Sequence, residues 1–239
     1  MAEEKNYDEI LALQARWDKI RVANVFDTLD QMGHPNQVID LGIRPLRPDQ
    51  HLAGQAVTVR GRRDPRSREE LAQADPNGDA TGSYYRLSRA VYPGSVIVID
   101  GAGEATTGKL GEMTSWWMKQ RGALGVVIDG AIRDYLGVVD IPGWTVCCRT
   151  TSPIESLGRY HFMDINDVIA LPGTLTNQVR INPGDWIVGG DDGVIVVPQE
   201  ISMDALKVAE DIEQREEGMR RDLAAGLRFG EAFQKWNRI

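Results

Sequence analysis

Three charged residues and one glycine carry the spacing with the clearest chemical meaning in this chain of 239 residues. Glu112 follows Gly111, and the pair Arg133-Asp134 comes after a further 20 residues, just beyond an apolar run that ends at Gly130. A guanidinium can hold a carboxylate with two parallel hydrogen bonds, and carboxylate oxygens are hard ligands for divalent ions. The combination predicts a site for a carboxylate-bearing substrate beside a divalent metal.

The same residues also fit a purely structural role. Arg133 and Asp134 could form an ion pair at a turn, and Glu112 could be a carboxylate favoured by the positive end of a helix. Spacing alone leaves both interpretations open. The metal, if present, is expected to be Mg²⁺ or Mn²⁺ rather than zinc, because the three histidines, at 34, 51 and 161, have no zinc-type spacing. His161 is expected to be a surface or packing residue.

The elements that must position these residues form a predicted βαβ unit. Residues 93–101 (PGSVIVIDG) and 123–130 (ALGVVIDG) have the pattern of buried strands, and residues 111–122 (GEMTSWWMKQRG) that of a helix. Such a unit has parallel neighbouring strands and a right-handed crossover. Ligands bind at the carboxyl edge of parallel strands, beside free N–H groups at a helix start. Glu112, Arg133 and Asp134 should therefore meet at one edge.

The remaining patterns predict one α/β domain over residues 1–239 with helical ends. A helical N-terminal extension reaches about residue 33, with helices from Tyr7 to about Ile20 and from Val22 to Met32. A C-terminal helix over about 202–225 stops at Gly226, and residues 229–236 add another turn or two. Further strands are expected at 53–61, near 167–173 and within 179–198, where Asp191-Asp192-Gly193 forms a hairpin turn. The charged segment 62–82 is expected to be a long loop.

Two glycine-rich patterns resemble nucleotide-binding motifs but are incomplete. Residues 103–109 fit a P-loop up to Lys109, but Leu110 stands where a Ser or Thr is needed for the metal, so nucleotide binding is not predicted. Gly101-Ala102-Gly103 lacks the third glycine of a dinucleotide fingerprint. Trp116 and Trp117, next to each other on the predicted helix, are expected to pack, and one of them could wall a pocket.

Charge and cysteine content narrow the class of protein. A net charge of −8 gives no broad attraction to nucleic acid or to an anionic membrane surface, and no apolar run reaches the length of a membrane span. The adjacent Cys147 and Cys148 lie in a predicted strand, so they should point to opposite faces and not bond each other. With an acidic N-terminus and no disulfide framework, the chain is expected to be cytoplasmic.

With these residues in hand, the sequence resembles the RraA-like family. That family includes class II pyruvate aldolases acting on 4-hydroxy-4-methyl-2-oxoglutarate and 4-carboxy-4-hydroxy-2-oxoadipate. The motif that carries the resemblance is an acidic residue, 20 residues and then Arg-Asp, set here in GKLGEM…RGALGVVIDGAIRD. The strings RVANVFDTLDQMG, LAGQAVTV, INPGD and DDGVIVVP are similar to family segments in the same order. The resemblance spans roughly residues 20 to 220.

The resemblance implies a compact β/β/α fold of the swivelling-domain type, assembled as homotrimers or homohexamers with sites at subunit interfaces. It implies that Asp134 binds the divalent ion, and that Arg133 holds the pyruvate carboxylate together with backbone amides at Met113 and Thr114, next to Gly111. Glu112 would hold a metal-bound water that passes protons. By a looser alignment, Asp27 and Glu213 would reach the site from a neighbouring subunit.

The implied activity is a lyase that splits a 4-hydroxy-2-oxo acid into pyruvate and a second carbonyl compound through a metal-stabilised enolate, with slow oxaloacetate decarboxylation beside it. The alternatives are a non-catalytic regulator that binds a ribonuclease, as some members do, and another enolate-forming lyase or decarboxylase. The chain departs from the family pattern at Glu112, where aldolases often have Asp, at Trp116-Trp117 and in the charged 62–82 segment. Because of these departures, the resemblance does not determine which chemical group the substrate carries at its far end.

Overall fold

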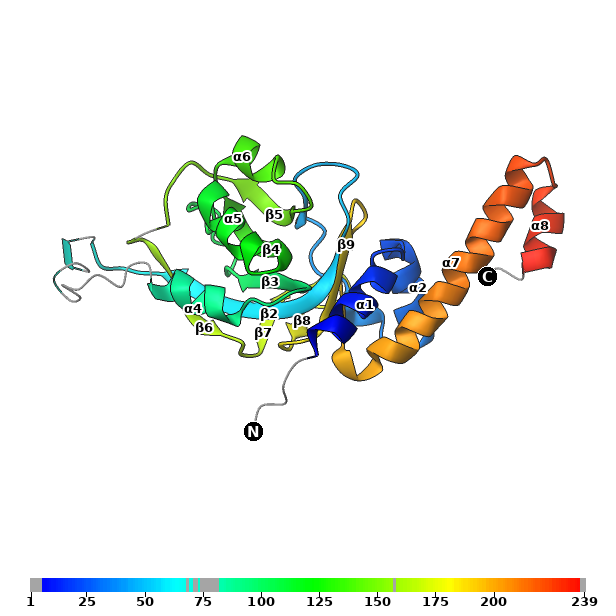
Figure 1. Ribbon diagram of the computed structural model, residues 1–239, viewed down its shortest axis with the longest axis horizontal. Coiled ribbons are helices and arrows are strands. Elements are labelled where there is room, and N and C mark those ends of the chain that lie inside the picture. The colour runs from blue at the N-terminus through cyan, green and yellow to red at the C-terminus, as the bar shows by residue number, and fades with distance from the viewer. Residues whose placement is uncertain (1–5, 68, 71–72, 74–81, 157, 237–239) are drawn as a thin grey trace.

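The computed structural model describes residues 6–67, 69–70, 73, 82–156 and 158–236 (Figure 1). In this part of the chain, eight strands form a mixed sheet in the order β1-β5-β4-β3-β2-β9-β10, with β6 paired to β2, while β7 and β8 form a separate antiparallel pair. The strand bounds are Arg44–Pro45 (β1), Leu52–Arg63 (β2), Ser95–Asp100 (β3), Ala123–Ile132 (β4), Thr145–Thr151 (β5), Tyr160–Ile165 (β6), Ile169–Pro172 (β7), Gln178–Ile181 (β8), Trp186–Gly190 (β9) and Gly193–Val197 (β10). Strand β1 approaches β9 and β10, so the sheet curves until its two edges nearly meet.

The helices form two groups around this sheet. Helices α5 and α6 lie over the parallel strands β4 and β5, and α4 packs beside β6, whereas α1, α2 and α7 gather at the opposite end, and α8 packs on the far end of α7 (Figure 1). Their bounds are Tyr7–Trp17 (α1), Val22–Gln31 (α2), Gly82–Ala90 (α4), Glu112–Gln120 (α5), Tyr135–Val139 (α6), Ser202–Ala224 (α7) and Phe229–Trp236 (α8), with short 3-10 turns at Pro35–Gln37 (η1) and Gln199–Ile201 (η3). No helix among the described residues has both the length and the apolarity that crossing a bilayer requires.

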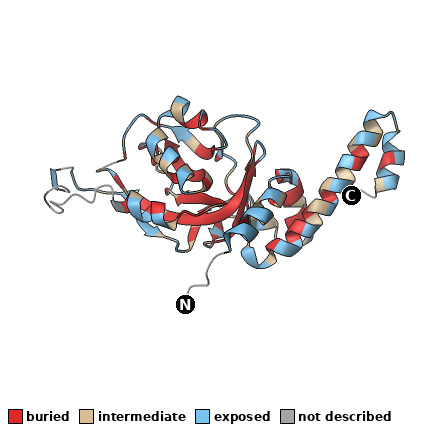
Figure 2. Cartoon of the chain, in the orientation of Figure 1, coloured by how far each residue is buried: buried red, intermediate tan, exposed pale blue. Residues whose placement is uncertain are grey.

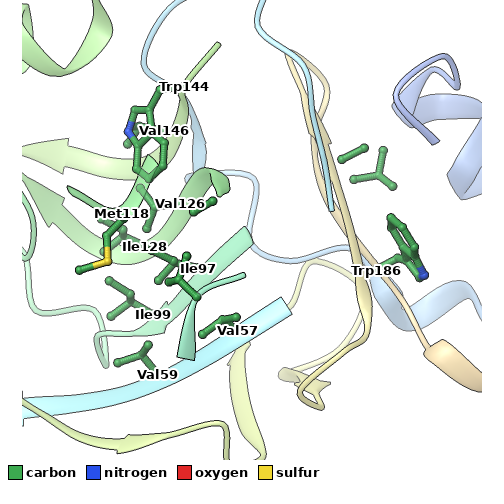
Figure 3. Packing of buried hydrophobic residues seen from close by; sticks show 14 of the residues in the cluster. Val57, Val59, Ile97, Ile99, Met118, Val126, Ile128, Trp144, Val146 and Trp186 are labelled. Atoms are coloured by element: carbon green, nitrogen blue, oxygen red, sulfur yellow. The ribbon is translucent and has the colours of Figure 1, made fainter. Parts of the chain in front are cut away.

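Strands β3 and β4 form the centre of the buried core (Figure 2). They are apolar almost without interruption because side chains cover both faces of the sheet at this point. On one face, Ile97, Ile99, Val126 and Ile128 pack with Met118 of α5 (Figure 3). The rotation of α5 about its own axis is thereby fixed by the core.

Cys147 and Cys148 lie on the two faces of β5, as the alternation of a strand predicts. Cys147 belongs to one buried cluster and Cys148 to the other, and both are free thiols. The prediction that they do not form a disulfide is confirmed. The hairpin predicted at Asp191-Asp192 is also confirmed, because β9 ends at Gly190 and β10 begins at Gly193.

The predicted βαβ unit is confirmed, with one correction to its second strand. Strands β3 and β4 are parallel neighbours, with Ile99 opposite Ile128. The predicted break at Gly130 is wrong, because β4 passes through an irregularity after Ile128 and continues to Ile132. This extension brings the chain directly to Arg133 and Asp134.

The other predicted boundaries differ from the structure by a few residues. Helix α1 ends at Trp17 instead of near Ile20, whereas α7 ends just before Gly226, whose φ is +93°. The loop predicted to begin at Arg62 begins only after Arg63, because β2 continues to Arg63 in antiparallel pairing with β6. Much of the rest of that predicted loop, at 68, 71–72 and 74–81, lies outside the described residues.

Candidate active site

The segment that leads from β3 to α5 runs beside the end of β4. The backbone N–H of Lys109 donates to the carbonyl oxygen of Ala131 at 2.9 Å, and that of Arg133 donates to the carbonyl oxygen of Leu110 at 3.0 Å. Residues 108–110 therefore provide hydrogen-bond partners for the backbone N–H and C=O groups at the end of β4, beyond the point where β3 has ended. This pairing fixes where Arg133 leaves the sheet.

Two glycines allow this close approach. A Cβ atom added at Gly108 would lie 2.6 Å from Cβ of Arg133, and one added at Gly111 would overlap the carboxylate of Asp134. Neither residue has the positive φ that by itself favours glycine. The glycines at 108 and 111 are thus required for space, because the backbone of the loop packs directly on the Arg-Asp pair.

Arg133 and Asp134 touch each other and remain accessible. Arg133 Nε lies 3.3 Å from Asp134 Oδ1, and the two side chains are 31% and 41% exposed. The other oxygen of Asp134, Oδ2, accepts a hydrogen bond of 3.2 Å from the backbone N–H of Glu112 at the start of α5. The Asp134 carboxylate therefore already occupies an anion-favouring position at a helix N-terminus.

Asp134 has a left-handed backbone conformation, with φ of 57° and ψ of 47°. Among residues with a side chain, Asp and Asn tolerate this region best, at a cost on the order of 1 kcal/mol. Strained backbone of this kind concentrates at functional sites, where surrounding structure over-determines it. In this conformation the Asp134 side chain reaches the start of α5, where it accepts the hydrogen bond from Glu112.

A cavity of about 400 Å³ opens beside this pair. Its lining includes the polar side chains of Thr114, Arg133 and Asp134 next to the backbone of Gly111. Its volume falls in the range of small-molecule sites. The predicted residues Gly111, Met113, Thr114, Arg133 and Asp134 all line it, so the structure brings this part of the predicted site together.

Glu112 has a different position from its predicted neighbours. Its backbone reaches Asp134, but its carboxylate packs on α6, where a Cβ added at Gly137 would overlap Oε2. Glu112 is not among the described residues that line the cavity. Its role as the holder of a metal-bound water stays a prediction.

Asp27 and Glu213 lie at the other end of the chain's fold. They belong to α2 and α7, in the helical group remote from α5 and the end of β4 (Figure 1). Glu213 accepts a hydrogen bond of 2.7 Å from Asn24 Nδ2 and pairs with Arg220 at 3.0 Å. Neither acid reaches the cavity of its own chain, so a role in catalysis would require a neighbouring subunit and stays a prediction.

Sequence reasoning missed a buried ion pair below the site. The Lys109 side chain has no solvent exposure, and its ammonium contacts the Glu104 carboxylate, donates to the Thr107 carbonyl at 2.8 Å and lies 4.2 Å from the centroid of the Tyr160 ring. Burial lowers the pKa of Lys109, against the opposing effect of Glu104. Burial alone would raise the pKa of Glu104, but hydrogen bonds from Lys109 and from residues 106–107 outweigh it and lower that pKa to about 2. A lysine between two glycines, in GKLG, was the available signal.

A tyrosine from α4 completes the floor of the cavity. Tyr84 Oη donates to the carbonyl oxygen of Lys109 at 2.9 Å and lies 2.7 Å from Ser156 Oγ. Burial raises the pKa of Tyr84, so its phenol stays protonated as a donor. No sequence pattern pointed to Tyr84 or Ser156; Tyr84 lies just beyond the 62–82 segment that was expected to be a loop.

The carboxylates at the cavity determine which kind of divalent ion could bind there. Among the described residues, no three His, Cys, Asp or Glu side chains converge as a ligand cluster. The accessible Asp134 carboxylate offers hard oxygen atoms at the cavity. One or two carboxylates, completed by water and substrate oxygens, suit Mg²⁺, whereas a structural zinc site needs four protein ligands. The residues present fit a magnesium-type ion.

Comparisons with known proteins agree with this architecture. The family model described as "RraA-like: Aldolase/RraA" matches residues 22–196, so the chain belongs to the RraA-like family. A protein of Halalkalibacterium halodurans named "Putative 4-hydroxy-4-methyl-2-oxoglutarate aldolase" is 32% identical over 181 residues, which are 73% of this chain and 74% of that protein.

Two solved structures share the fold over most of the chain. RraAS2 of Streptomyces coelicolor, described as an unusual member of the RNase ES inhibitor RraA protein family, has a TM-score of 0.72 and 26% identity, and covers 88% of this chain and 98% of its own. An uncharacterized protein of Pseudomonas syringae has a TM-score of 0.73 and 22% identity, with 93% and 96% of the two chains covered. The predicted RraA-like fold is thereby confirmed. Its relatives carry both aldolase and ribonuclease-inhibitor names.

Proposed function

We propose that this protein is a divalent-metal-dependent lyase that cleaves a 4-hydroxy-2-oxo acid into pyruvate and a second carbonyl compound. The observation that carries the proposal is the cavity in which Arg133, Asp134 and the start of α5 converge. A guanidinium, an accessible carboxylate and a helix N-terminus are the groups needed to bind a 2-oxo carboxylate and to stabilise its enolate.

The 2-oxo carboxylate would bind between Arg133 and the first turn of α5. The first hydrogen bond within this helix runs from Ser115 N–H to the Gly111 carbonyl, so the amides of Met113 and Thr114 precede it. These amides have no partner within the helix and lie at its positive end. They can therefore share the carboxylate with Arg133, which fixes the reacting carbons relative to Asp134.

The bond between C3 and C4 of the substrate would break in this arrangement. Its electron pair passes to C3 and forms the pyruvate enolate, while the C4 hydroxyl loses its proton and becomes a carbonyl. Asp134 would hold Mg²⁺ or Mn²⁺, which when bound supplies Lewis-acid stabilisation of the enolate oxygen. Glu112, whose backbone N–H donates to Asp134, would hold the water that takes the hydroxyl proton, and a proton returned to C3 completes pyruvate.

Two further parts of the proposal concern assembly and location. A homotrimer or homohexamer would allow Asp27 and Glu213 of one subunit to approach the cavity of the next. The two free cysteines support a reducing compartment, and we propose the cytoplasm.

The second candidate function is that of a ribonuclease-binding regulator without catalysis. It is favoured by the similarity to RraAS2, whose description places it in a ribonuclease-inhibitor family. A third candidate is decarboxylation, because oxaloacetate would give the same enolate at the same site. The accessible arginine and aspartate at an open cavity favour the lyase over the regulator.

The test is formation of pyruvate, followed with lactate dehydrogenase and NADH. The protein is incubated with Mg²⁺ and either 4-hydroxy-4-methyl-2-oxoglutarate or oxaloacetate. We expect pyruvate from the wild type, a loss of about 100-fold or more in Arg133→Ala, and unchanged turnover in Arg180→Ala, whose arginine lies on β8 with Nε 3.1 Å from Asn182. Absence of pyruvate from both acids, together with tight binding to a ribonuclease, would establish the regulator instead.

A further inference from the structure

We infer that the substrate of this site carries an apolar group, best of all an aromatic ring, at C4, and no second carboxylate at that end. The inference rests on the proposed lyase function and adds to it the class of substrate. It comes from the apolar residues that line the same cavity as the arginine.

These residues form what we call the aromatic wall, defined as the rings of Tyr85 of α4 and Trp117 of α5 together with the thioether side chain of Met113 of α5. The rings of Tyr85 and Trp117 meet edge to face, with centroids 4.9 Å apart and planes at 74°. Met113 is 68% exposed and Tyr85 is 55% exposed, and all three residues line the cavity. Apolar groups that hold such exposure beside a binding cavity gain free energy when a ligand covers them.

The helix itself directs a bound substrate towards the aromatic wall. Met113 and Trp117 are four residues apart and Thr114 and Trp117 three apart, so they share one face of α5. A carboxylate held at the first turn of α5 therefore places the rest of the molecule along this face. The atom furthest from the carboxylate then lies against Trp117.

The charges around the cavity disfavour a second carboxylate. Glu155 lines it and holds Oε1 4.0 Å from a terminal nitrogen of Arg133. Among the described lining residues, the cations are Arg133 and Lys109, and Lys109 is buried against Glu104. One carboxylate can bind at Arg133, but Tyr85, Met113 and Trp117 carry no charge, so a second carboxylate against them would lose solvation without a counter-charge, which is costly.

A suitable probe is 4-hydroxy-2-oxo-4-phenylbutanoate. Its retro-aldol cleavage breaks the C3–C4 bond, leaves the electron pair on C3 of the pyruvate enolate and turns the C4 hydroxyl into the carbonyl of benzaldehyde. One proton leaves the hydroxyl and one is added to C3, so the reaction is balanced without an oxidant or reductant. 4-Hydroxy-2-oxopentanoate, which gives acetaldehyde, and 4-hydroxy-4-methyl-2-oxoglutarate, which gives two molecules of pyruvate, are the methyl and dicarboxylate comparisons.

The experiment measures kcat/KM for all three acids with Mg²⁺ present. We expect the phenyl acid to exceed the dicarboxylate by about tenfold or more, a usual discrimination for an apolar pocket. Trp117→Ala should lower kcat/KM for the phenyl acid by about tenfold and for the methyl acid far less. The matched control is Trp116→Ala, because Trp116 lies on the same helix but does not line the cavity. That variant should leave the ratio between the phenyl and methyl acids unchanged.

The outcomes separate the inference from the proposed function. No pyruvate from any of the three acids would refute the lyase itself. Pyruvate with the dicarboxylate preferred would leave the lyase in place and overturn the apolar specificity. Equal effects of Trp117→Ala and Trp116→Ala on the ratio of phenyl to methyl acid would likewise overturn the aromatic wall as its source, and circular dichroism of each variant checks that the fold is retained.

Discussion

Replacing Lys109 by methionine should destabilise the protein by about 3 kcal/mol, because it breaks a buried ion pair by removing one partner. Methionine fills much of the volume of the lysine stem, so the change removes charge with little loss of packing. The Lys109 side chain is fully buried and that of Glu104 is 11% exposed, so solvent cannot replace the lost ammonium. Glu104 keeps hydrogen bonds from the backbone of Thr106 at 2.9 Å and from Thr107 Oγ1 at 2.8 Å, which places the cost at the low end for buried pairs.

Thermal unfolding followed by circular dichroism measures this loss. For a chain of this size, about 3 kcal/mol corresponds to a fall in Tm of about 6–12 °C. The double variant Glu104→Gln with Lys109→Met should recover at least half of the loss, because it leaves no unpaired charge in the interior. A single variant that unfolds within 2 °C of the wild type, taking about 2–4 °C per kcal/mol, would show that the Lys109–Glu104 contact is not desolvated in solution.

The same pair gives a dependence of stability on pH. The pKa of Glu104 is about 2 in the folded protein against an ordinary value of 4.5. The folded protein therefore binds fewer protons than the unfolded chain between these values. The contribution of Glu104 to the free energy of unfolding is fully present above pH 4.5 and is lost as pH falls towards 2. The free energy of unfolding should drop over this window less steeply in the double variant than in the wild type.

Three further predictions concern the site itself. Asp134→Asn should reduce pyruvate formation by about 100-fold or more with little change in Tm, because asparagine also tolerates the left-handed backbone found at this position; a variant with near-normal turnover would refute the role of the carboxylate. Gly111→Ala should lower both turnover and stability, the latter by about 1–3 kcal/mol, since its Cβ overlaps the Asp134 carboxylate; an unchanged Tm would contradict the close packing. Chelation with EDTA should abolish turnover, and added Mg²⁺ should raise the Tm of the wild type but not of Asp134→Asn; equal shifts would place the ion elsewhere.

The sequence sufficed for the βαβ unit because its signals are local. Apolar runs bounded by glycines specify β3 and β4, and the segment between them has the length and composition of a helix. The position of Arg133 and Asp134 at the carboxyl edge then follows from the general geometry of parallel strands. The extension of β4 to Ile132 could not be predicted in this way. It depends on backbone pairing with Thr150 and Thr151 of β5 and with residues 108–110, which contact the end of β4 only in the folded chain.

The site residues that the sequence did not predict, Lys109, Tyr84 and Ser156, all depend on contacts that form only in the folded chain. Lys109 is charged and flanked by a glycine, so by composition it belongs on a surface loop, yet it is buried because Glu104 and Thr107 satisfy its ammonium. Tyr84 and Ser156 become neighbours only when α4 and the segment before β6 close over the floor of the cavity. The position of the Glu112 side chain could not be predicted from the sequence either, because the packing of its carboxylate on Gly137 depends on where α6 begins.

The rotation of α5 links the core of this protein to the specificity proposed for it. Met118 and Ser115 are fully buried, and Met118 packs between the side chains of β3 and β4 (Figure 3). Because successive residues of a helix differ by 100° around its axis, burial of Met118 determines that Trp117, and not Trp116, faces the cavity. The amides at the start of α5 point along the helix axis and depend little on this rotation. The binding of the 2-oxo carboxylate is thus set by where the helix begins, and the choice of the group at C4 by how the helix packs on the sheet.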